Sequence, residues 1–399
     1  MSMLDWRYYP KIARIARMAG ADVGRGSETL MTYSRGDLFR AARHLSGSKE
    51  GRPARALVVT GFYIPKAAQP AAETDGPLGA LEVCMALRAI GGDAWLVSDE
   101  CCAPVIRPSA LGFLPDDHVL IAPNANPKGG FGAWLNGVID LAKTEHIDTL
   151  VYIERVGPAR DGSPHNMRGI DITEWTVPLS QLTLLGLHTI GVGDGGNEIG
   201  MGRVEDYAIE GVVDHGENIA CTVPTDQLVV AGTSNWGAHA LVCAMRALGR
   251  SAVDPYLEPT WQERVLDVIV EYGGLDGVHM TNVATVDGLE PDRYFKQVGQ
   301  LTDCARSLRT APAAGILCPR LKALRSRLPL HVRRFRIGCR GMCRDLAESR
   351  FDTPEHRLRF WCRAPFCGNI EPVRHNRGNG RKDSRKESRN DFLEPKEAP

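Results

Sequence analysis

Short apolar runs alternate with longer amphipathic segments over the first 300 residues. The apolar runs predict buried strands, since a strand covered on both faces needs few polar positions; they lie at residues 55–61, 94–98, 117–122, 149–154, 184–192 and 227–231. Apolar residues with helical spacing predict helices at residues 11–20, 36–46, 77–90, 130–145, 177–187, 235–248 and, as the last one, 259–272. This alternation predicts an α/β fold: a doubly wound, mostly parallel sheet with helices on both faces.

The segments outside this alternation are read from their turn residues. Residues 64–72 are rich in proline and alanine and predict a loop over a strand end. Residues 155–168 predict a loop too long for a plain connector, which is typical of lids and binding loops. A strand with polar turns is expected at residues 206–218.

Polar side chains follow four of the predicted strands. Thr60, Glu154, Asp194 and Thr233 each come directly after, or close to, a strand end. In a doubly wound sheet, ligands bind beyond the carboxyl ends of the strands. The sequence therefore predicts an active site at that edge, built from these four segments.

The densest of these segments is residues 189–202. Four glycines occupy six positions from Gly191 to Gly196, and Asp194, Asn197 and Glu198 lie among or beside them. Glycines let backbone N–H groups converge on a ligand, but two carboxylates would repel an anion. The loop thus favours a small zwitterionic substrate or a metal ion.

A second interpretation of the same loop stays open. The spacing Gly191-x-Gly193-x-x-Gly196, with Asp214 downstream, fits the fingerprint of dinucleotide-binding folds. This pattern alone has low specificity. It predicts a nucleotide- or dinucleotide-using enzyme as the alternative.

The whole string from Gly191 to Gly202 resembles the signature of the D-glutamate cyclase family. Further segments resemble that family in the same order, so that the resemblance covers roughly residues 1 to 300: residues 59–62 with 73–79, residues 154–158 with 166–171, residues 232–237 and, in part, residues 286–290. In the animal mitochondrial proteins of this family, the cyclase-like domain lies C-terminal to a hydro-lyase-like domain. The resemblance implies a lyase that cyclises D-glutamate to 5-oxo-D-proline with loss of water.

That reaction needs a base for the amine and an acid for the departing hydroxyl. Asp194 and Glu198 are the candidates, with Glu154 in reserve. Arg155 and Arg168 are candidates to clamp a carboxylate, and a helix starting near Asn197 would offer it N–H groups. The complete predicted substrate-binding set is Thr60, Gly61, Asp75, Gly76, Arg155, Asn166, Arg168, Gly193, Gly195, Gly196, Asn197, Thr233, Ser234 and Asn235.

A divalent metal is an alternative use of the same carboxylates. Asp75, Glu154, Asp194 and Glu198 offer the hard oxygen ligands that Mg²⁺ or Mn²⁺ prefers. Metal-free acid–base chemistry is the favoured expectation, with no cofactor. A zinc site at Cys339-x3-Cys343 and Cys362-x4-Cys367 is disfavoured, because the spacing is loose.

Charge separates the chain into two predicted parts. The net charge is zero, but residues 309–399 hold 22 Lys and Arg against 10 Asp and Glu, which makes them +12 and residues 1–308 −12. The sequence thus predicts a cyclase-like α/β domain over residues 1–308 and a basic, irregular, flexible tail over residues 309–399. A non-catalytic binding module whose tail contacts nucleic acid is a further, disfavoured alternative; a homo-oligomer is left open.

The expected compartment is reducing. The 11 cysteines follow no secreted framework, no signal peptide opens the chain, and no apolar run is long enough to cross a bilayer. A cytoplasmic enzyme is expected, with the mitochondrial matrix as the alternative. Residues 9–21 mildly resemble a transit peptide, but an ordinary amphipathic helix is favoured.

Overall fold

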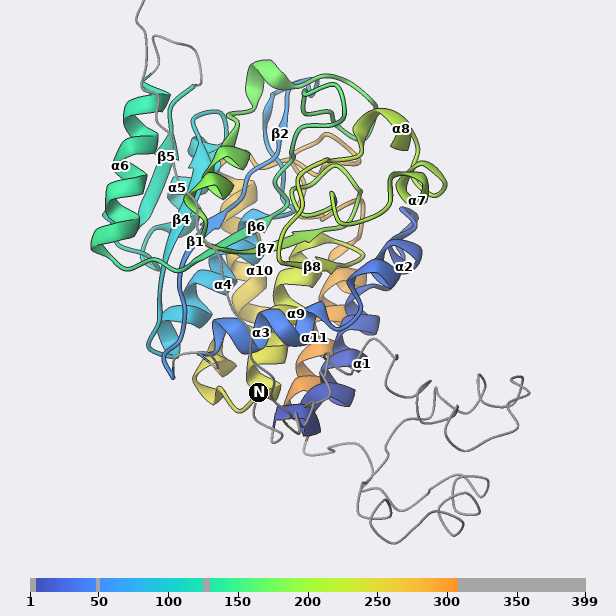
Figure 1. Cartoon of the computed structure of the whole chain (residues 1–399). Helices are drawn as coiled ribbons and strands as arrows, with labels where there is room; N and C mark the ends of the chain where they lie inside the picture. Colours follow the sequence, from blue (N-terminus) through green and yellow to red (C-terminus); the bar gives the residue numbers. More distant parts are fainter. Residues whose placement is uncertain (1–4, 48–50, 125–129, 308–399) are drawn as a thin grey trace, which may run out of the picture. The chain divides into compact units, whose positions relative to one another are not determined.

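The computed structural model describes residues 5–47, 51–124 and 130–307 (Figure 1). In this part, six parallel strands form one sheet in the order β5-β4-β1-β6-β7-β8. Their bounds are β1 (Arg55–Val59), β4 (Asp93–Asp99), β5 (Val119–Ala122), β6 (Thr149–Ile153), β7 (His188–Gly193) and β8 (Gln227–Val230). The predicted doubly wound sheet is confirmed. The order reverses between β1 and β6, and a crevice forms at the carboxyl ends of the strands at such a point.

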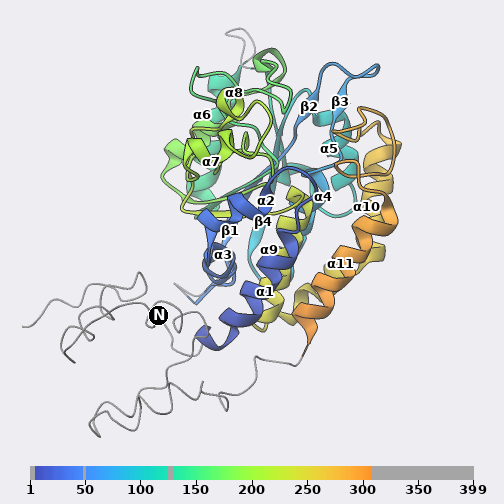
Figure 2. The same ribbon diagram turned by 90° about the vertical axis from the view of Figure 1, so that its right-hand side faces the viewer.

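Helices cover both faces of the sheet, as predicted. Ala56 and Val58 of β1 pack into one apolar core, while Leu57 and Val59 pack into the other, because side chains alternate along a strand. The first core is closed by α1 (Tyr9–Ala19), α3 (Asp37–Leu45), α4 (Pro77–Ala89), α5 (Ala103–Ala110), α9 (Ser234–Ala247), α10 (Pro259–Glu271) and α11 (Pro291–Arg306). The second contains α6 (Phe131–Thr144), α7 (Asp206–Glu210), α8 (Gly216–Ile219) and the 3-10 helix η5 (Leu179–Leu185). Figure 2 shows α6, α7 and α8 on the opposite side of the strands from α10 and α11.

Helix α9 lies at the centre of the first core. All of its 14 residues except Arg246 are buried, and it packs against α1, α3, α4 and α11. Its N-terminus, at Ser234, points to the carboxyl edge of the sheet because it follows β8 after only three residues. The helix therefore fixes the position of the residues at its first turn.

Three sequence predictions are wrong. Residues 206–218 form α7 and α8 and not a strand. Ala208 and Ile209 are buried within the short helix α7, and His215, before α8, has φ +60°. Residues 177–187 hold only the 3-10 helix η5, so β7 begins at His188 and not at residue 184. Residues 259–272 are not the last helix.

Helix α11 was missed. Its buried residues Tyr294, Val298, Leu301 and Ala305 have helical spacing, but polar residues such as Lys296 and Gln297 dilute the pattern. The loop that joins α10 to α11 includes Asp287 and returns the chain to the carboxyl edge of the sheet.

The other predicted strands, and the helices predicted at residues 11–20, 36–46, 77–90, 130–145, 235–248 and 259–272, lie within a few residues of the observed ones. The loop at 64–72 joins two short strands, β2 (Tyr63–Ile64) and β3 (Ala71–Ala72), and residues 155–168 contain no helix or strand. Helix α1 buries Ile12 and Ile15, as an ordinary amphipathic helix does. No helix in the described part of the chain is long and apolar enough to cross a membrane. The predictions for residues 309–399, with their cysteine pairs, lie outside the described residues.

Candidate active site

A cavity of about 210 Å³ lies at the carboxyl edge of the sheet. Its lining comes from the segments after β1, β6 and β7, from the N-terminal segment and from the loop between α10 and α11. It consists of Arg25, Phe62, Tyr63, Ile64, Glu73, Glu154, Asn166, Met167, Arg168, Asp194, Gly277, Val278 and Asp287. The strand ends thus meet at one edge, as the topology requires.

A cluster of carboxylates lies in and behind this cavity: Glu73, Asp75, Glu154, Asp194 and Asp287. Burial raises the pKa of Glu73, Asp75, Glu154 and Asp194 well above ordinary values, and repulsion between neighbouring carboxylates raises these pKa values further. These four carboxyl groups therefore bind their protons more tightly than exposed carboxyl groups do. A carboxyl group with a raised pKa is suited to general acid–base chemistry.

Arg25 provides the positive charge within this cluster. Its Nη1 donates to both carboxylate oxygens of Asp194 at 2.9 Å, and its Nη2 donates to Oδ1 of Asp287 at 2.5 Å. Burial alone would lower the pKa of Arg25, but Asp194 and Asp287 raise it well above its usual value. The guanidinium therefore remains cationic and opposes the upward shift in the pKa of Asp194.

The position of Arg25 is set by a short turn before α2 (Ser27–Leu30). One oxygen of Asp22 accepts the backbone N–H groups of Gly24, Arg25 and Gly26, each at 3.0 Å. Gly24 and Gly26 have positive φ angles, which glycine adopts without strain. The turn therefore presents the arginine from outside the sheet.

The glycine-rich loop after β7 binds a carboxylate of its own chain. Glu198 accepts the backbone N–H groups of Asp194 at 3.0 Å, Gly195 at 2.7 Å and Gly196 at 2.8 Å. A Cβ atom at Gly193 would lie only 2.9 Å from this carboxylate. The glycines thus leave room for Glu198, and the amides expected to bind a substrate anion are already occupied.

The dinucleotide interpretation does not fit this loop. No helix begins at Asn197, whose side chain donates to the carbonyl oxygen of His165; the next helix is α7, at Asp206. Asp214 is exposed between α7 and α8 and follows no strand. The strand–turn–helix arrangement that places a pyrophosphate at a helix N-terminus is therefore missing.

Other predicted substrate-binding residues form hydrogen bonds to the carboxylates of the cluster or next to them. Asp75 accepts the backbone N–H groups of Ser234 and Asn235 at 2.8 Å, and the Ser234 hydroxyl donates to Glu154 at 2.6 Å. The side-chain oxygen of Asn235 accepts the N–H groups of Gly76 and Gly79, and Thr233 caps α9. These contacts join the first turns of α4 and α9 beneath Glu154.

Thr60 and Gly76 lie in the same layer. Both residues are buried, and the Thr60 hydroxyl has no hydrogen-bond partner in the described part of the chain. A Cβ atom at Gly76, whose φ is +99°, would lie 2.7 Å from the Cβ of Glu154. Gly76 therefore allows the backbone to approach Glu154 closely.

The two predicted arginine clamps lie in different places. Arg155 is 1% exposed; its guanidinium is 2.7 Å from Asp99 and donates to the carbonyl oxygens of Gly61 and Val177. Arg155 therefore stabilises the loop after β1 and does not line the cavity. Arg168 does line it, with one N–H group 3.3 Å from the carbonyl oxygen of Val278, and Asn166 lines it beside Arg168.

Two groups of carboxylates have oxygens within 4.8 Å of one another: Asp75, Asp194 and Asp287, and Glu154, Asp194 and Glu198. In the first group, the Arg25 guanidinium already contacts two of the three carboxylates. In the second, Glu198 is held by three backbone N–H groups. In each group, donors of the protein therefore already occupy carboxylate oxygens that a divalent ion would bind.

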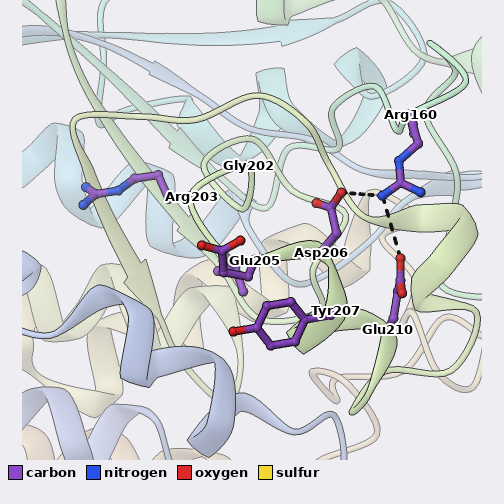
Figure 3. A pocket seen from close by; sticks show the side chains of 8 residues that line it. Arg160, Gly202, Arg203, Glu205, Asp206, Tyr207 and Glu210 are labelled. Atoms are coloured by element: carbon purple, nitrogen blue, oxygen red, sulfur yellow. Dashed lines mark hydrogen bonds and ion pairs between the residues drawn. The ribbon is translucent and has the colours of Figure 1, made fainter.

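A second hollow, of about 460 Å³, lies on the surface beside α7. Figure 3 shows Arg160 between Asp206 and Glu210, with Tyr207 nearby. These side chains are partly or largely exposed, so their ion pairs contribute little. The buried carboxylate cluster is therefore the stronger candidate for chemistry.

Three residues of the cluster were not predicted: Arg25, Glu73 and Asp287. Glu73 lies two positions before Asp75, in a segment that carried the family resemblance, and Asp287 lies in another. Glu73 and Asp287 are acidic residues close to glycines in predicted turns, and this pattern could have indicated them as site residues. Arg25 has no such signal, since its partners lie 169 and 262 residues away.

Fold and site together define a doubly wound α/β protein with a buried carboxylate cluster at its topological switch point. The chain belongs to the D-glutamate cyclase-like family: the family model described as "D-glutamate cyclase-like, C-terminal" matches residues 15–302. The human protein named "D-glutamate cyclase, mitochondrial" is 32% identical over 311 residues, which cover 70% of this chain and 49% of the human protein. The chain thus spans about half the length of that relative, and the resemblance seen in the sequence is confirmed.

Proposed function

We propose that this chain is a hydro-lyase that cyclises D-glutamate to 5-oxo-D-proline. The observation that carries the proposal is the cluster of buried carboxylates around Arg25 in a small cavity. Membership of a family that includes a protein named D-glutamate cyclase supports the substrate. An acidic amino acid with one ammonium and two carboxylate groups matches a cavity that offers carboxylates and two arginines.

The reaction transfers two protons from nitrogen to oxygen. The substrate ammonium loses one proton, its nitrogen attacks the γ-carboxyl carbon, and a C–N bond forms. A C–O bond of the γ-carboxyl group then breaks, and the nitrogen loses a second proton. The departing oxygen takes up both protons and leaves as water. The overall reaction neither consumes nor releases protons, so groups that accept and return them are what it requires.

The environments of the carboxylates suggest how the roles divide. Asp194 contacts Arg25, which opposes the rise in its pKa, so Asp194 is the group best suited to be the ionised base. Burial, Glu198 and Glu73 all raise the pKa of Glu154, which suits it to be the acid. Glu198, held by the loop amides, would position Asp194 and not exchange protons with substrate.

The proposal is tested with purified protein supplied separately with D-glutamate and L-glutamate. Chiral chromatography of 5-oxoproline should show product from the D form, and a surface variant, Asp206→Asn, should give the same rate. Well-folded protein that forms no 5-oxoproline from either enantiomer would remove the proposed function.

Chelators should leave turnover unchanged within about twofold. The expected reason is that Arg25 already supplies the positive charge that a metal would bring to Asp194 and Asp287. Initial rates are compared before and after dialysis against EDTA. Loss of activity that Mg²⁺ or Mn²⁺ restores would show that the cluster binds a metal instead.

The carboxylate cluster should also make stability depend on pH. Burial and the nearby Asp287 and Asp75 raise the pKa of Glu73, so the folded state binds this proton more tightly than the unfolded state. The stabilisation is complete below the ordinary carboxyl pKa of 4.5 and is lost as the pH rises through the raised value. Glu73→Gln should therefore increase the free energy of unfolding at pH 8 by about 1 to 2 kcal/mol. Urea unfolding at pH 5 and pH 8 measures this; an equal change at both values would contradict it.

A further inference from the structure

Asp287 carries a carboxylate oxygen that accepts no hydrogen bond from the described part of the chain. Its Oδ1 accepts from Arg25, but its Oδ2 is buried without a hydrogen-bond partner in residues 5–47, 51–124 and 130–307. The side chain is 3% exposed and lines the cavity. A buried carboxylate oxygen without a donor is costly, which points to a ligand that supplies one.

The backbone at Asp287 is held in an unusual conformation. Its φ is +53°, a region that residues other than glycine seldom occupy. Asp276 holds the flanking residues, because its Oδ2 accepts the Thr285 hydroxyl and the Gly288 N–H group at 2.8 Å each. Strain of this kind persists where the surrounding structure imposes it, often at ligand sites.

Arg25 has hydrogen-bonding capacity to spare beside this oxygen. A guanidinium has five N–H donors, and the bonds to Asp194 and Asp287 use three of them. The side chain lines the cavity and is 18% exposed. Among the described residues, two donors of Arg25 therefore remain for a carboxylate from a ligand.

In the other two aspartates of the cluster, each carboxylate oxygen already accepts a hydrogen bond. Both oxygens of Asp194 accept from Arg25, and both oxygens of Asp75 accept backbone N–H groups at the start of α9. Asp287 and Arg25 thus place an unused acceptor next to unused donors. An α-amino acid carries the complementary pair, an ammonium and a carboxylate on one carbon atom.

We propose that Asp287 and Arg25 form the receptor for the α-amino acid head group of the substrate. Oδ2 of Asp287 accepts from the ammonium, and the remaining N–H groups of Arg25 donate to the α-carboxylate. This assignment rests on the proposed function for the substrate class. It leaves the γ-carboxyl group to the part of the cavity that contains Glu154 and Arg168.

Three ligands separate the two contacts. D-Glutamate has both head-group charges, glutarate lacks the ammonium, and 4-aminobutyrate lacks the α-carboxylate. Dissociation constants are measured by titration calorimetry in a Glu154→Gln background, so that bound D-glutamate is not converted. Asp287→Asn and Arg25→Ala are added to this background, with Arg25→Lys as the conservative variant. Asp206→Asn and Arg160→Ala, from the exposed ion pair of Figure 3, serve as matched controls.

Asp287→Asn should raise the dissociation constant for D-glutamate by about 10- to 100-fold and that for glutarate by less than about threefold, since only the ammonium contact is lost. Arg25→Ala should raise the dissociation constant for D-glutamate by a similar factor and that for 4-aminobutyrate much less. Arg25→Lys should lie between, because lysine keeps the charge but not the fork of donors. The two controls should change nothing.

The assignment would be overturned if Asp287→Asn weakened the binding of all three ligands equally. It would also be overturned if D-glutamate bound to Arg25→Lys and Arg25→Ala as tightly as to the background protein. Thermal melting of each variant establishes that it is folded. The result is independent of turnover: protein that binds D-glutamate with this selectivity but forms no 5-oxoproline would retain the receptor and lose the proposed reaction.

Discussion

Replacing Asp194 by asparagine is expected to lower kcat for D-glutamate by about 10²- to 10⁴-fold. The amide has nearly the same shape, but it cannot accept a proton from the substrate nitrogen. Because Arg25 would still be held by Asp287, KM should change much less than kcat. Initial rates of 5-oxoproline formation, with chiral detection, measure both constants.

Asp206→Asn is the matched control, since its carboxylate is 48% exposed and lies outside the cavity. It should keep the rate of the unchanged protein. Circular dichroism must show that Asp194→Asn is folded at the assay temperature. Turnover within threefold of the unchanged protein would assign the base to another residue of the cluster.

The second large effect is expected on stability, at Glu198. Glu198→Gln replaces one acceptor oxygen by an NH2 group, which then faces a backbone N–H donor of Gly195 or Gly196. A hydrogen bond to a charged group contributes about 1.5 to 3 kcal/mol, and three such bonds are weakened or lost. Relief of repulsion from Glu154 offsets part of this cost, so the free energy of unfolding should fall by about 2 to 4 kcal/mol.

Denaturant unfolding at pH 7 measures the change, with Glu210→Gln on the surface as control. The same variant also separates the two roles of Glu198. If Glu198 only positions the loop, activity should return in part under stabilising conditions such as low temperature. A variant as stable as the unchanged protein would mean that the three N–H contacts contribute little.

The fold was largely predictable because its signal is local. Each strand of the sheet is a short apolar run, and each large helix has apolar residues on one or more faces, so the alternation identifies the class. The segment at 206–218 was misread because buried Ala208 and Ile209 fit either period over so short a span. Helix α11 was missed because charged residues surround its apolar face.

The site was harder to predict because its contacts are long-range. The strand ends gave Glu154 and Asp194, which line the cavity. The sequence pattern could not show that the Glu198 carboxylate binds the backbone N–H groups of its own loop. Nor could it show that Arg155 pairs with the buried Asp99. Both depend on where side chains point after folding, which composition and spacing do not specify.

The contact between Arg25 and Asp287 has a consequence for the order of folding. These residues are 262 positions apart, so their pairing is among the most non-local in the described chain and carries a large loop-closure entropy. A nascent chain that ends with α10, at Glu271, would have Arg25 but not Asp287, and its remaining carboxylates would lack their final arrangement. The proposed receptor for the head group therefore forms late in synthesis, and a chain truncated after α10 would lack it even though it contains all six strands of the sheet.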